Sequence, residues 1–153
     1  CLRLTAGRGT VCQPGRMLAL KEGGRTTGVA YKLPENALEQ ELTLLWKREM
    51  ITGCYLPTWC QLALDDGRTV NALVFIMDPR HPLYESYTRA QIIAPLIAAA
   101  SGPLGTNAQY LFSLEQELAR LGMRDDCLND LVAKVRGLLG ENQPERGFNP
   151  GFA

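Results

Sequence analysis

Long apolar runs and an excess of one charge are both missing from this sequence. Its longest apolar run, residues 92–100, is interrupted by Pro95 and is about half of the roughly 20 residues that a helix needs to cross a bilayer. Sixteen basic residues balance sixteen acidic ones, so no overall positive charge is available to attract nucleic acid or an anionic membrane. We therefore expect neither nucleic acid nor a membrane as partner, and recognition by local chemistry.

Paired cysteines and paired histidines are missing as well. The cysteines are odd in number and form no C-x-x-C pair, which argues against a disulfide framework and a zinc knuckle. His81 is the only histidine, so no zinc site can be assembled from several imidazoles. We expect reduced thiols, a cytoplasmic location and no metal. The five cysteines are Cys1, Cys12, Cys54, Cys60 and Cys127.

The composition is that of an ordinary globular protein. Hydrophobic residues make up 46% and charged residues 21% of 153 positions, a length that suits one domain. We place this domain at residues 1–139. The remaining residues, 140–153, are rich in Gly, Pro and Asn and are expected to form an irregular tail.

The first half of the chain is dominated by segments that read as β-strands, most of them alternating apolar and polar residues. Turn residues between neighbouring segments predict two hairpins, with Gly23-Gly24 in the first turn and Asp65-Asp66-Gly67 in the second. The expected strands are Cys1–Thr5, Arg16–Lys21, Thr27–Leu33, Tyr55–Leu64 and Arg68–Met77.

Apolar residues at helical spacing occur in one segment between these strands and in most of the second half of the chain. Pro34 to about Met50 has no internal glycine and carries leucines at helical intervals. Three more helices are expected at Thr88–Ala100, Asn107–Leu121 and Asp125–Leu139, with Thr106 or Asn107 capping the second of them. Strands early and helices late indicate a single α+β fold.

One carboxylate lies on the apolar face of the first expected helix. At about 100° per residue, Glu49 falls in the same narrow sector as three leucines and continues their stripe. Withdrawal from water disfavours the charged form of a carboxyl group, which suits a general base working near neutral pH. Alternatively, the helix ends before Met50 and Glu49 is a solvated end residue. The leucines are Leu38, Leu42 and Leu45.

Other polar residues give weaker signals. The glycine-rich loop Ser101–Asn107 precedes a helix, where an anion could bind, but its spacing matches neither the phosphate-binding loop nor the dinucleotide fingerprint. Tyr55 and Tyr110 can each donate a hydrogen bond, to a ligand or, more commonly, within the fold.

Four segments carry a further pattern, in order and at matching spacing over nearly the whole chain. They are Arg8-Gly9-Thr10 with Pro14-Gly15-Arg16; Gly28-Val29-Ala30-Tyr31 with Leu33-Pro34; Trp46-Lys47-Arg48-Glu49-Met50 with Gly53 and Tyr55; and Ser101-Gly102-Pro103-Leu104-Gly105 with Asn107, Tyr110, Leu111 and Phe112. Together they resemble the glutathione-specific branch of the ChaC family of γ-glutamylcyclotransferases, and its enterobacterial members most.

This resemblance implies a fold, a reaction and a set of residues. The fold is a small, partly open mixed β-barrel flanked by helices. The reaction cleaves glutathione to 5-oxoproline and cysteinylglycine, with no metal and no cofactor. The family's catalytic acid and base corresponds to Glu49, the residue already singled out by helical spacing. The resemblance implies substrate contacts for Arg8, Tyr55, Asn107 and Tyr110.

The sequence departs from the family pattern at its start. The family's Tyr-Gly-Ser-Leu loop, which closes over the γ-glutamyl group, is not among these residues, and the first residue is Cys. We therefore expect an N-terminally truncated member without its first strand or strands. Such a chain should turn over glutathione slowly by itself and pair its open sheet edge with another segment, for example from a second copy.

Two alternatives to a glutathione-cleaving enzyme stay open. One is a non-catalytic regulatory or binding protein associated with cation transport, as the family was long described. The other is an enzyme acting on γ-glutamyl compounds other than glutathione.

Overall fold

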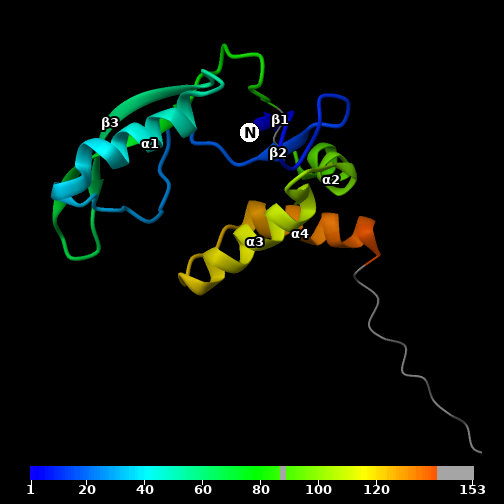
Figure 1. Cartoon of the computed structure of the whole chain (residues 1–153). Helices are drawn as coiled ribbons and strands as arrows, with labels where there is room; N and C mark the ends of the chain where they lie inside the picture. Colours follow the sequence, from blue (N-terminus) through cyan, green and yellow to red (C-terminus); the bar gives the residue numbers. More distant parts are fainter. Residues whose placement is uncertain (87–88, 141–153) are drawn as a thin grey trace, which may run out of the picture. The chain divides into compact units, whose positions relative to one another are not determined.

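The computed structural model describes residues 1–86 and 89–140, and the chain divides into two compact units. The first unit contains residues 1–2 and 18–86, and the second contains residues 3–17 together with the chain from residue 87 onward. Figure 1 labels the main helices and strands of both units. Apart from Gly140, the expected irregular tail lies outside the described residues, as does Thr88.

A long hairpin forms the frame of the first unit. Strand β3 (Tyr55–Ala63) pairs antiparallel with β4 (Thr69–Met77) along its whole length, from Tyr55 opposite Met77 to Ala63 opposite Thr69. The turn between them places Gly67 at φ +83°, a conformation in which a side chain would be strained. The predicted hairpin with its Asp-Asp-Gly turn is confirmed.

A helix packs beside this hairpin. A 3-10 turn at Glu35–Ala37 leads into α1 (Leu38–Met50), which lies alongside β3 in Figure 1. The ring of Trp46 meets the ring of Phe75 edge-on, with centroids 6.4 Å apart, a favourable geometry for aromatic pairs. The predicted helix is confirmed, and it does not end before Met50.

The predicted first hairpin is wrong. Thr27–Leu33 forms no strand, and most of the segment is exposed, with Tyr31 at 85%. Of the expected strand Arg16–Lys21, only the start belongs to a strand, and Leu20 makes a single bridge to Ile76. An alternating segment becomes a strand only when another strand pairs with it, and no described strand pairs with Thr27–Leu33.

Three helices and short strands make up the second unit (Figure 1). The helices are α2 (Ala90–Ala99), α3 (Asn107–Arg120) and α4 (Asp126–Leu139). Strand β1 (Leu2–Leu4), of which residues 3–4 belong to this unit, pairs with β2 (Gly15–Met17), and β5 (Ser101–Gly102) pairs with β6 (Gly105–Thr106). Apolar residues of the helices and their ends form the core: Ile93, Ala94, Ile97, Ala100, Ala108, Leu111, Val132 and Val135.

Side chains fix where α3 begins. Thr106 Oγ1 accepts a hydrogen bond from the Gln109 amide at 3.1 Å, and Gln109 Oε1 accepts one from the Thr106 amide at 3.0 Å. This reciprocal pair satisfies two backbone donors at the start of α3, one of them the amide of the cap residue itself. Of the two capping residues that the sequence offered, the cap is therefore Thr106, and Asn107 is free for another contact.

Together the elements confirm the α+β class. In the part of the chain that the structure describes, the strands form three two-stranded sheets, and none of these closes into a barrel. The small, partly open β-barrel implied by the resemblance is present here only as these pairs.

Candidate active site

Glu49 lies in the last turn of α1, on the stripe where helical spacing placed it. Leu42, Leu45 and Glu49 are half-buried, whereas Leu38 at the other end of the stripe is 45% exposed. The side chain of Glu49 itself is 23% exposed. The carboxylate is therefore partly withdrawn from water and still accessible to a small molecule.

Arg48 sets the orientation of this carboxylate. Its Nε donates to Glu49 Oε1 at 2.8 Å, and its Nη2 lies 2.8 Å from the same oxygen. The Arg48 side chain is 74% exposed, so the ion pair approaches Glu49 from the solvent side. Both contacts use Oε1, so Arg48 does not engage Oε2. The sequence analysis did not predict this role of Arg48. The one feature that could have indicated it is that Arg48 directly precedes Glu49 in the sequence.

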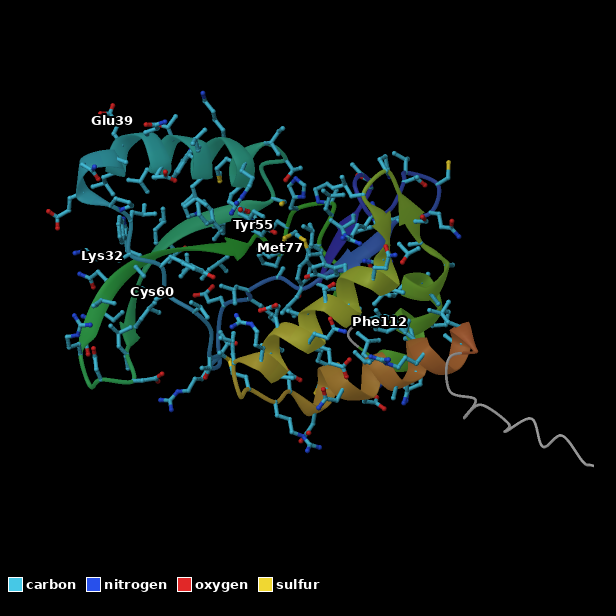
Figure 2. All side chains as sticks on the ribbon, turned by 60° about the horizontal axis from the view of Figure 1, so that its bottom comes forward. Lys32, Glu39, Tyr55, Cys60, Met77 and Phe112 are labelled. Carbon is cyan, nitrogen blue, oxygen red and sulfur yellow. The ribbon has the colours of Figure 1, made fainter. Side chains whose placement is uncertain are left out.

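Tyr55 follows Glu49 after a short turn and begins β3. Its ring meets Phe75 edge-on at 6.4 Å between centroids, and its register partner Met77 is 2% exposed. Figure 2 shows Tyr55 and Met77 at the same end of the hairpin. Packing against Phe75 thus fixes the Tyr55 ring in the first unit.

Arg8, Asn107 and Tyr110 come together in the second unit, around the start of α3. Arg8 Nη1 donates to the carbonyl oxygen of Thr106 at 3.0 Å. Asn107 is the next residue, and Tyr110 follows one turn later on α3, half-buried. Of the five residues that the resemblance implies, these three are therefore neighbours, and Glu49 and Tyr55 belong to the first unit.

Glycines allow the backbone to approach closely around Arg8. A Cβ on Gly102 would lie 2.8 Å from the Gly9 amide nitrogen and would also collide with the Gly7 carbonyl oxygen. Any larger residue at this position would push the segment apart. The glycines of the Arg8-Gly9-Thr10 and Ser101–Gly105 segments therefore have a packing reason that local sequence patterns do not reveal.

Asn107 holds a distant backbone segment. It is fully buried, its Oδ1 accepts from the Arg16 amide at 2.6 Å, and its Nδ2 donates to the Arg16 carbonyl at 2.8 Å. One side chain thus satisfies both backbone groups of a β2 residue that is 91 positions away. The contact ties β2 to the start of α3.

Residues 1–86 and 89–140 contain neither a membrane-spanning helix nor a metal-ligating cluster. Within these ranges no helix has the length and hydropathy to cross a bilayer. In the same part of the chain, His, Cys, Asp and Glu side chains form no group of three that could ligate a metal ion.

A sequence model of the family described as ChaC-like protein matches residues 1–138. The chain belongs to the ChaC family. It is 83% identical over all 153 residues to the glutathione-specific gamma-glutamylcyclotransferase of Escherichia coli strain K12, and it spans 66% of that protein's length. Gamma-glutamylcyclotransferase 2-3 of Arabidopsis thaliana is 30% identical over 147 residues, which cover 91% of this chain and 74% of the plant protein.

A solved structure shares the fold of this chain. The crystal structure of a γ-glutamylcyclotransferase specific to glutathione from yeast matches with a TM-score of 0.70 and 20% sequence identity. The match covers 90% of this chain and 83% of the yeast chain. At this identity the likeness confirms the fold of the ChaC chain.

Proposed function

We propose that this ChaC-family chain carries the catalytic residue of a glutathione-specific γ-glutamylcyclotransferase, which cleaves glutathione to 5-oxoproline and cysteinylglycine. The observation that carries the proposal is the 83% identity, over the whole chain, to the E. coli protein named for this activity. The proposal concerns the protein to which these 153 residues belong.

The chemistry needs a base before anything else. The α-amine of the substrate's glutamyl group is the nucleophile, and at neutral pH it is mostly an ammonium ion because such groups have a pKa near 8. Glu49 removes a proton from it. The freed amine then attacks the γ-carbonyl carbon of the same molecule, forming the new C–N bond of a five-membered ring. The protein's task is to hold the substrate folded back on itself.

The same carboxyl group completes the reaction. As the C–N bond to cysteinylglycine breaks, the protonated Glu49 returns its proton to the departing amine, so it acts first as base and then as acid. The ring nitrogen loses its remaining extra proton to water or to the released amine, which leaves the single N–H of 5-oxoproline. The attack is intramolecular, so this scheme forms no covalent bond to the enzyme. Partial exposure of Glu49 and the Arg48 contacts on Oε1 support this role, because Oε2 is then the atom that takes up and returns the proton.

The remaining predicted residues are assigned by the resemblance. We propose that Arg8 recognises a carboxylate of the substrate and that Tyr55 and Tyr110 position the γ-glutamyl group through their hydroxyls. Asn107 was predicted to contact substrate, yet both polar ends of its side chain are engaged with Arg16. We propose that it contributes by holding β2 against the start of α3.

The experiment measures 5-oxoproline by mass spectrometry after incubation with glutathione. Two proteins are compared: the 153-residue chain, and a chimera that joins it to the parts of the E. coli relative that it does not match. Formation of 5-oxoproline and cysteinylglycine in equal amounts by the chimera supports the proposal. A folded chimera that forms neither product refutes it and favours the regulatory binding protein. Faster turnover of γ-glutamyl-alanine than of glutathione would contradict the proposed specificity.

A further inference from the structure

One flank of α1 carries an exposed apolar stripe inside a shallow groove of about 660 Å³. Leu38 is 45% exposed and Trp46 is 49% exposed, whereas Leu42 between them is half-buried. Leu38 and Leu42 also belong to the stripe that continues to Glu49, but Glu49 does not line the groove, and the proposed reaction gives no role to Glu39, Trp46 or Lys47. An apolar stripe bordered by charges is typical of a helix that binds another helix.

The charges along this groove are sorted by sign. Glu35 and Glu39 lie at its N-terminal end, and Lys47 lies at its C-terminal end. Lys32 is paired with Glu35 at 3.5 Å, but within the described ranges neither Glu39 nor Lys47 is paired with a charge of its own chain. Figure 2 shows Glu39 pointing away from the β3–β4 hairpin. The groove thus presents one free negative and one free positive side chain, two turns apart.

We propose that this groove binds the α1 helix of a second copy of the chain, in antiparallel orientation. If the two-fold axis passes near Thr43, residues at equal distances on either side of Thr43 face each other. Glu39 then lies opposite Lys47 of the second copy, and by symmetry Lys47 lies opposite Glu39, each pair about 6 Å along the helix from the axis at 1.5 Å per residue.

The apolar residues fit the same arrangement. Trp46 falls between Leu38 and Leu42 of the second copy, so the indole enters the space between two leucines. Thr43 is small enough to let the helix axes approach to roughly 8–10 Å, the usual distance for packed helices. The acidic and basic residues flank this contact as the charged positions flank the seam of a coiled coil.

Charge complementarity favours a second copy over another partner. In an antiparallel pair of α1 helices the acidic end of one groove faces the basic end of the other. A two-fold symmetric interface requires a surface that is complementary to itself in this way. A helix of 13 residues buries less area than a standard stable interface, so the dimer is weak and concentration-dependent. The inference does not depend on the proposed function, since no residue of this contact has a role in the reaction.

Exchange of the two charges tests the proposal in the 153-residue chain. Self-association of the parent, Glu39→Lys, Lys47→Glu and the double variant is measured by sedimentation equilibrium, at concentrations up to about 1 mM because the interface is small. Each single variant should weaken association by roughly tenfold, since two attractive pairs become repulsive. The double variant should recover it. A 1:1 mixture of the two single variants should also associate, because both contacts between unlike chains are then of opposite charge.

Two control variants separate this contact from other effects. Glu41→Lys makes the same charge change in the first turn of the same helix, but on the opposite side, and should leave association unchanged. Lys21→Glu, in an exposed coil, controls for net charge. A parent that stays monomeric overturns the proposal. So does weakening by Glu41→Lys equal to that by Glu39→Lys, or a mixture that fails to associate. If none of the four single substitutions alters association, the contact lies elsewhere, for example at a sheet edge. That result would also overturn the proposal.

Discussion

Replacing Asn107 by Ala should destabilise the second unit more than any exposed substitution. The change removes both hydrogen bonds that Asn107 makes to the backbone of Arg16, at 2.6 and 2.8 Å. Loss of a hydrogen bond to a buried backbone group costs about 1–3 kcal/mol. Arg16 is only half-buried, so in the variant water can form hydrogen bonds to its backbone and offset part of this cost. We expect the free energy of unfolding to fall by about 2–4 kcal/mol in total.

Chemical and thermal unfolding measure this loss. Urea titration followed by the helical circular dichroism signal gives the free energy of unfolding, and Tm should fall by roughly 5–12 °C for a chain of this size. Asn71→Ala, at an exposed position of β4, is the matched control and should change stability by about 0.5 kcal/mol or less. If Asn107→Ala costs less than about 1 kcal/mol, the bonds to Arg16 do not hold β2 in place and the reasoning fails.

Three further predictions concern a glycine, an ion pair and a tyrosine. Gly102→Ala should destabilise by about 1–3 kcal/mol through the clash of its Cβ with neighbouring backbone, whereas Gly28→Ala, with open space around it, should be nearly neutral; equal effects in urea unfolding would refute the packing argument. Hydrogen bonds from Arg80 lower the pKa of Asp78 from its usual 3.8, so this stabilisation is present above that value and is lost as pH falls through the lowered pKa. Arg80→Ala should raise the pKa of Asp78 in an NMR titration, and an unchanged titration would contradict that cause. Tyr110→Phe in the chimera should lower kcat/KM by about tenfold or more, which is the effect expected from losing one hydrogen bond to the substrate. Unchanged kinetics would mean that the role of Tyr110 is purely structural.

Elements with a local signal were predicted well. The β3–β4 hairpin was visible because alternation on both sides of Asp65-Asp66-Gly67 needs nothing beyond neighbouring residues. The helix up to about Met50 and the side of it that carries Glu49 were predicted from 3.6-residue spacing, which left open whether the helix ends before Met50. Thr106 was one of two candidate caps because Ser, Thr, Asp and Asn side chains accept from nearby amides.

Features that depend on distant partners were not predictable in this way. Thr27–Leu33 has the alternation of a strand, but pairing requires another strand, and the residues themselves do not say whether one is present. The bonds of Asn107 to Arg16 join positions 91 residues apart, and no periodicity in the sequence links them. The close backbone contacts of Gly102 with Gly7 and Gly9 are hidden for the same reason.

The role of Glu49 is the central claim, and one substitution in the chimera tests it. Glu49→Gln keeps the shape of the side chain but removes its ability to take up a proton, so kcat/KM for 5-oxoproline formation should fall by about 10²–10⁴-fold. Glu41→Gln, an exposed residue of the same helix, should leave the rate unchanged, and circular dichroism should show both variants folded. A Glu49→Gln rate within about threefold of the parent would contradict the account and remove Glu49 from the reaction.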